Sequence, residues 1–183
     1  MNELNNNIKS VSEILKLIQE KNYKKAENEL IKVLNKKKDN HYAHFLLGGV
    51  YAIIKRFESA AKHFQLSLKL KPDNKNAYYN LGIMYDELGD LDKSKNSFEQ
   101  ALKLDDNYLN ANLALAKIYE RQKNFEKAKN FFEKTLSINK DFLLANQMYG
   151  KFLINIGEIN RGQYYNYKYS GIIRFNEKEL KIF

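Results

Sequence analysis

Histidines are the residues of this 183-residue chain whose type and spacing come closest to a chemical site. His41 and His44 stand three residues apart, a spacing that places two imidazoles on one face of a helix, as metal ligands require. No third ligand is evident near them, and His63 stands alone on another predicted helix. The sequence therefore predicts no metal site, and packing is the expected role of His44.

Catalytic groups do not form a pattern either. Serines and carboxylates do not occur at a recognisable nucleophile or acid–base spacing, and there is no glycine-rich phosphate loop. The chain has no cysteine, which excludes thiolate zinc sites, iron–sulfur clusters and cysteine nucleophiles. We expect a protein that is not an enzyme and that needs no cofactor.

The segments that would position any site are predicted to be helical. A single proline, Pro72, few glycines and long stretches of Leu, Ile, Lys, Glu and Ala favour an all-α chain. No run approaches the roughly 18 apolar residues of a membrane span, and the first residues lack a basic and then apolar signal segment. We expect no membrane association and a cytosolic location.

A pattern with a period of 34 residues organises these helices. Its first mark is a small residue inside a predicted helix, at Gly48, Gly82, Ala116 and Gly150. A second small residue follows twelve positions later, at Ala60, Ser94, Ala128 and Gly162. An aromatic residue comes four positions after that, at Phe64, Phe98 and Phe132, and Asn166 breaks the series. Because glycine inside a helix costs roughly 0.5 to 1 kcal/mol relative to alanine, its recurrence indicates close contact between paired helices.

This pattern resembles the tetratricopeptide repeat (TPR) family. Residues 75–108 match the family pattern almost throughout, with Tyr78 where the family prefers tryptophan. The resemblance implies an all-α, right-handed α-solenoid of about five helix-turn-helix repeats in one domain over residues 1–183. The expected repeats are residues 7–40, 41–74, 75–108, 109–142 and 143–176, with a degenerate C-terminal cap over residues 160–183. The first repeat matches the pattern less well, because Ile14 stands where the other repeats have Gly or Ala. The last repeat departs from the pattern at Asn166, where the three repeats before it have Phe.

The resemblance also implies a concave groove, lined by the first helix of each repeat, where partners bind as extended peptides or helices. The family's groove positions correspond here to Tyr42, Phe45, Asn76, Tyr79, Asn80, Ile83, Asn110, Leu113, Lys117 and Arg121, with Gly49, Ile53, Asp86, Glu87, Glu120, Leu144, Gln147, Lys151 and Asn155 beside them. Aromatic side chains bury apolar area and amides hydrogen-bond a main chain, so this mixture suits a peptide. We expect a non-catalytic scaffold that binds a protein partner.

One known TPR ligand is excluded by the residue types. The clamp that holds the acidic C-terminal tail of chaperones needs lysine, asparagine, asparagine, lysine and arginine at fixed groove positions. Those positions hold Phe45, Gly49, Asn80, Asn110 and Ala114, and only Asn80 agrees. We therefore expect no chaperone-tail binding.

Two other functions remain open. The chain could be the regulatory or substrate-presenting module of a multi-component enzyme. RNA binding is the second, because helix-pair repeats of related shape read RNA one base per repeat and the formal net charge here is +9. Residues 75–108, however, carry four Lys and Arg against seven Asp and Glu, whereas a surface that tracks phosphates would keep one sign. The charge pattern therefore argues against a nucleic acid partner.

The C-terminal segment departs most from the repeat. Tyr164, Tyr165, Tyr167 and Tyr169 lie on the last predicted helix, and the apolar Ile172, Ile173, Phe175, Leu180 and Phe183 follow. One interpretation is a cap, in which the apolar residues cover the open end of the array. The other is a second interaction site, in which the tyrosines act together with Arg161, Lys168 and Arg174.

Overall fold

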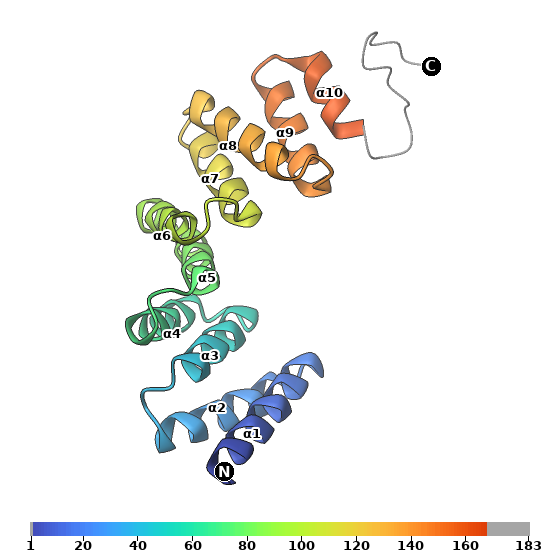
Figure 1. Cartoon of the computed structure of the whole chain (residues 1–183). Helices are drawn as coiled ribbons and strands as arrows, with labels where there is room; N and C mark the ends of the chain where they lie inside the picture. The colour runs from blue at the N-terminus through green and yellow to red at the C-terminus, as the bar shows by residue number, and fades with distance from the viewer. Residues whose placement is uncertain (1, 168–183) are drawn as a thin grey trace. The chain divides into compact units, whose positions relative to one another are not determined.

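The computed structural model describes residues 2–167, with side chains from residue 11 onward. Within residues 2–167 the chain forms ten α-helices and no strand, as the all-α prediction requires (Figure 1). They are α1 (Asn2–Gln19), α2 (Tyr23–Lys36), α3 (His41–Ile53), α4 (Phe57–Leu70), α5 (Lys75–Glu87), α6 (Leu91–Leu104), α7 (Leu109–Arg121), α8 (Phe125–Ile138), α9 (Leu143–Asn155) and α10 (Ile159–Tyr167).

The helices follow the predicted period. The first helices α3, α5, α7 and α9 begin at residues 41, 75, 109 and 143, which are the predicted repeat boundaries. The second helices from α2 onward also begin 34 residues apart. Helix α1 begins earlier than the predicted residue 7, at Asn2. The part of the predicted C-terminal cap from residue 168 onward, including Tyr169 and Lys168, lies outside the described residues.

The chain divides into two compact units at Leu104 and Asp105. The first unit contains α1 to α6 and the second contains α7 to α10. The prediction of one continuous domain, and of its handedness, therefore stays a prediction.

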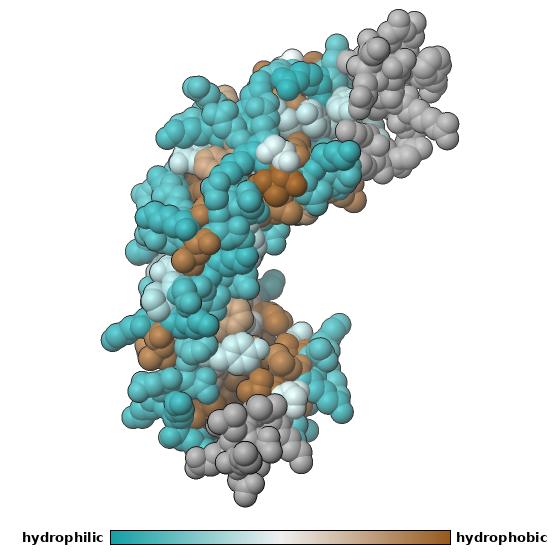
Figure 2. All heavy atoms as spheres, in the orientation of Figure 1, coloured by the Kyte–Doolittle hydropathy of each residue, from teal (hydrophilic) through white to brown (hydrophobic). Residues whose placement is uncertain are grey.

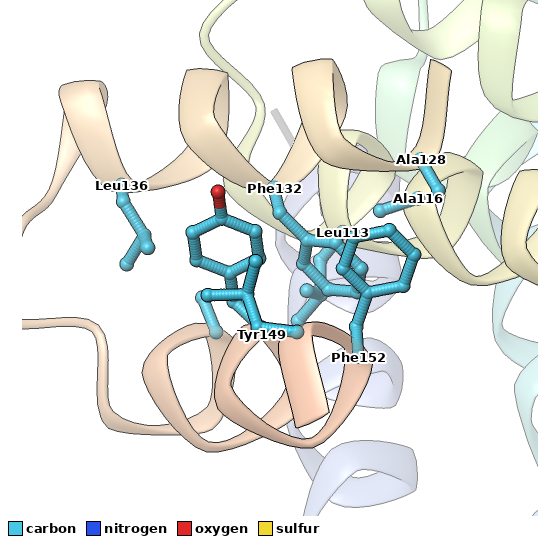
Figure 3. Packing of buried hydrophobic residues seen from close by; sticks show 9 residues of the cluster. Leu113, Ala116, Ala128, Phe132, Leu136, Tyr149 and Phe152 are labelled. Atoms are coloured by element: carbon cyan, nitrogen blue, oxygen red, sulfur yellow. The ribbon is translucent and has the colours of Figure 1, made fainter. Parts of the chain in front are cut away.

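Each unit has its own apolar core. In the first unit, Leu30 and Leu47 belong to one cluster of buried residues, and Phe64 and Leu81 belong to a second. In the second unit, the rings of Phe132, Tyr149 and Phe152 pack against one another in the core (Figure 3).

The small residues allow the paired helices to approach each other. A Cβ atom on Gly48 would lie 2.9 Å from the ring of Phe64, which is closer than real Cβ contacts. The hydroxyl of Ser94 is buried and donates a hydrogen bond to the carbonyl of Gly82 at 2.8 Å. In the last hairpin, Asn166 replaces the aromatic residue, and its Oδ1 would lie 2.5 Å from a Cβ on Gly150. The predicted reason for the recurrent small residues is thus confirmed.

Asparagines secure the turns between hairpins. The side chains of Asn40 and Asn74 cap α3 and α5 by accepting hydrogen bonds from the amides of Ala43 and Ala77. Inside α7, the buried Asn112 donates to the carbonyl of Asp106 at 3.0 Å, in the turn that precedes the helix. These bonds stabilise the beginnings of α3, α5 and α7.

Every turn within a hairpin contains one residue with left-handed backbone. These residues are Lys21, Lys55, Gly89, Lys123 and Gly157, with φ values of 59°, 61°, 80°, 57° and 90°. The predicted turn at Gly89 is confirmed, whereas the lysines at the equivalent positions occupy a conformation that costs a residue with a Cβ about 1 to 2 kcal/mol.

Replacement of Lys123 by glycine is therefore expected to raise the free energy of unfolding by about 0.5 to 1 kcal/mol, because relieved strain exceeds the added entropy of the unfolded chain. Gln122 precedes it with an ordinary φ of −78°, so Gln122→Gly is the matched control and should not stabilise. Urea denaturation followed by circular dichroism measures the free energies of unfolding of both variants. A lower value for Lys123→Gly than for the wild type would contradict the expectation.

Candidate functional site

The predicted groove residues of the first unit lie on α3 and α5. Tyr42 is 38% exposed, and its ring stacks on Phe45 with 6.4 Å between ring centroids. Phe45 also contacts Phe64 of α4 at 5.8 Å. These contacts hold the two rings in place while part of their surface remains open to solvent.

Helix α5 supplies a second aromatic residue. Tyr79 is half-buried against Phe98 of α6, with ring centroids 5.6 Å apart, and burial raises the pKa of its hydroxyl. The hydroxyl therefore stays protonated at physiological pH. Asn76 lies on the same helix and is exposed.

A hollow of about 690 Å³ lies within the first unit, between α3 and α5. Its apolar lining comes from Ala52, Ile53, Phe57, Phe64, Ile83 and Met84. Asn80 contributes an amide to the wall, and Lys55 and Glu87 contribute opposite charges. Apolar side chains gather beside α3 on the surface of this unit (Figure 2). Five of the predicted groove positions therefore meet at a hollow large enough for side chains of a ligand: Gly49, Ile53, Asn80, Ile83 and Glu87.

The exposed side chain of Ile53 in this hollow leaves part of the free energy of apolar burial unused. Its side chain is 49% exposed, although full burial of an isoleucine gains about 1.5 to 3 kcal/mol. An apolar group of a partner placed in the hollow would recover part of that free energy.

In the second unit, the predicted groove residues of α7 have different environments. Asn110, Lys117 and Arg121 are exposed. Leu113 is not: it is 5% exposed and packs in the core cluster with Tyr149 (Figure 3). Its assignment to a binding surface is therefore wrong, because the apolar side chain is already buried against α9.

The histidines also differ from the sequence interpretation. His63 does not stand alone, because its Nδ1 lies 2.9 Å from the Nδ1 of His44. The Nε2 of His44 lies 3.1 Å from the carbonyl of Lys38, which can only accept a hydrogen bond. Neutral His44 must therefore carry its proton on Nε2, and His63 donates from Nδ1 to the free Nδ1 of His44. His44 is buried, as predicted, and both of its nitrogens are engaged.

This pair should make stability depend on pH. Burial, then His44 and then Lys62, lower the pKa of His63 to about 4 from its ordinary 6.5. The unfolded chain takes up the proton first, so the stabilisation is complete above pH 6.5 and declines as the pH falls towards 4. Since His63 is half-exposed, we expect a loss on the order of 1 kcal/mol.

Urea denaturation of the wild type and of His63→Gln, from neutral pH down to the acidic limit of this window, measures that dependence. The difference between their free energies of unfolding should shrink as the pH falls. Parallel curves would contradict the assignment of the titrating group.

In the described part of the chain, no three His, Cys, Asp or Glu side chains come together in an arrangement that could hold a metal ion. None of the described helices is both long enough and apolar enough to cross a bilayer.

Similarities to known proteins agree with the hairpin architecture. The chain resembles the solved structure of MamA, with a TM-score of 0.77 and 24% identity over 84% of this chain and 90% of that one. It also resembles PilF of Pseudomonas aeruginosa, with a TM-score of 0.79 and 19% identity over 92% of this chain and 77% of that one. A third structure, YrrB, has a TM-score of 0.71 and 15% identity over 85% of this chain and 80% of that one. At these sequence identities, the three similarities show that the fold is shared.

No curated protein sequence matches the chain. Sequence models of the tetratricopeptide repeat, in contrast, match residues 16–75, 76–108 and 109–142. These matches run without a gap from residue 16, near the end of α1, to residue 142. Their later boundaries lie within a residue or two of the starts of α5, α7 and α9. The chain belongs to the tetratricopeptide repeat family.

Proposed function

We propose that this protein is a non-catalytic interaction scaffold, and that the face formed by α3 and α5 binds a peptide segment of a partner protein. The hollow between these helices carries the proposal, because it combines an apolar lining with an amide and two charges. YrrB, which shares the fold, is described as a TPR protein with an unusual peptide-binding site.

The chemistry of the face fits a peptide. The partly exposed rings of Tyr42 and Phe45 offer apolar area at a small entropic cost, because contacts within the protein already restrain them. Asn80 has both a donor and an acceptor, so it can pair with a peptide group of the ligand. The hollow accommodates the side chain that anchors the segment.

Selection of peptides from a random display library tests this function. The selection uses the whole protein and the variants Ile53→Asp and Ile159→Asp. Ile159 is the matched control, because it is 53% exposed, much like Ile53, and lies in the second unit. Circular dichroism and thermal melting establish that each variant is folded.

We expect peptides selected on the wild type to lose at least tenfold in affinity for Ile53→Asp, because a carboxylate in the apolar hollow must be desolvated when the ligand binds. Their affinity for Ile159→Asp should be unchanged. Equal binding to all three proteins would show that the α3–α5 face is not the binding site.

A further inference from the structure

Two carboxylates stand at the carboxyl end of α5, where a helix is least suited to them. Asp86 and Glu87 are its last two residues, and its last turn contains no basic side chain. The carbonyl groups at the end of a helix carry partial negative charge, so carboxylates are disfavoured there and a cation is favoured. Helix α3 also has no basic residue in its last turn. The two neighbouring helix ends together attract a positive group.

Glu87 is the carboxylate that reaches the hollow. It is exposed, it lines the hollow, and it forms no ion pair with the residues from 11 to 167. On the other wall, Lys55 follows α3 and supplies one ammonium group. The lining therefore holds one carboxylate and one ammonium group, and the carboxylate lies on the α5 side, beside the partial negative charge of the helix end. The α5 side of the hollow is thus electronegative.

The spacing along α5 sets the spacing in the ligand. Ile83 and Glu87 both line the hollow and are four residues apart, which is about 6 Å along a helix axis. In an extended peptide, residues two positions apart are separated by about 6.6 Å and point to the same side. In a peptide that runs along α5, a side chain against Ile83 therefore places the side chain two positions away beside Glu87.

We propose that the ligand of this hollow is an extended peptide with a bulky apolar residue and, two positions away, a lysine or arginine. The apolar side chain fills the hollow against Ile53 and Ile83, the basic side chain pairs with Glu87, and Asn80 hydrogen-bonds the main chain. This inference rests on the proposed function, since it specifies the ligand of the same site.

The test is to repeat the peptide selection on the whole protein with Glu87→Lys, and with Glu126→Lys as the control for total charge. Glu126 is also exposed but lies on α8 in the second unit. Peptides enriched on the wild type and on Glu126→Lys should carry Lys or Arg two positions from an aliphatic or aromatic residue. Peptides enriched on Glu87→Lys should instead carry Asp or Glu at the position of that Lys or Arg.

Fluorescence anisotropy measures the affinities of one enriched peptide that carries lysine and of the same peptide with Glu in place of that lysine. The ratio of the two affinities gives the preference for a basic side chain. We expect the basic peptide to bind the wild type about three- to tenfold more tightly at low salt, with a smaller ratio at high salt. The ratio should invert in Glu87→Lys.

The outcomes separate the two proposals. Peptides that depend on Ile53 but show no charge preference, or prefer Asp or Glu on the wild type, would overturn the basic residue and leave the interaction scaffold intact. If no enriched peptide depends on Ile53, the α3–α5 face is not the binding site and both proposals fail.

Discussion

Gly82→Leu is expected to lower the free energy of unfolding of the first unit by about 3 kcal/mol, at the upper end of the range for overpacking. A Cβ atom on Gly82 would lie 2.6 Å from Cε1, 2.8 Å from Cδ1 and 2.9 Å from Cζ of Phe98. Phe98 is buried and also packs against Tyr79, so its ring has little room to move. The side chain of leucine would have to separate α5 from α6, despite its better helix propensity.

Gly49→Ala is the matched control for this prediction. Gly49 is also a helical glycine, on α3, but a Cβ atom there would have no neighbour within 4 Å. Alanine at this position should raise the free energy of unfolding by roughly 0.5 to 1 kcal/mol, because the helix gains propensity without a clash. Urea denaturation followed by circular dichroism measures both variants. A free energy of unfolding for Gly82→Leu that is higher than that of the wild type would refute the overpacking argument.

Tyr149→Ala should have the largest effect in the second unit, about 4 kcal/mol, in line with the truncation of large buried aromatic residues. Tyr149 is 0% exposed, and its ring stacks on Phe132 with 5.4 Å between ring centroids (Figure 3). The centroid of the Tyr165 ring lies 4.8 Å from that of Tyr149. Its side chain connects α8, α9 and α10. Removal leaves a cavity among these helices that they cannot fill without moving.

Tyr149→Phe separates the contribution of the ring from that of the hydroxyl group. The hydroxyl donates a hydrogen bond to Oε1 of Glu133 at 2.6 Å, and burial together with this carboxylate raises its pKa, so it remains a donor. Phenylalanine should cost only about 1 kcal/mol, because the carboxylate of Glu133 stays open to water. If alanine and phenylalanine destabilised the second unit equally, the stacked rings would not be its main source of stability.

Much of the fold was predictable because the repeat pattern is local. The period of 34 residues placed four first helices at their observed starts, since amphipathic spacing, small residues and turns act over a few neighbouring positions. The same register contains a further indication that sequence reasoning missed. Lys55 and Lys123 align with Gly89 and Gly157, so their left-handed backbone follows from their position in the repeat.

The candidate site was less predictable because it depends on contacts between helices. Leu113 and Ile83 both belong to the predicted groove, yet Leu113 is buried in the core of the second unit whereas Ile83 lines a hollow. His63 meets His44 because α4 packs against α3, a contact across nineteen residues of sequence. The spacing within one helix cannot report how closely the next one approaches.

The sequence by itself determined that this is an all-α chain of tetratricopeptide hairpins, and it determined why glycine recurs at Gly48, Gly82 and Gly150. Only the tertiary structure decided which apolar side chains are buried and which stay open, as Leu113 and Ile53 illustrate. It also placed Ile53 of α3 and Phe57 of α4 around the same hollow as Ile83 of α5. The physical reason is range: helix and turn preferences are set by near neighbours along the chain, whereas burial is set by what packs against a residue in space.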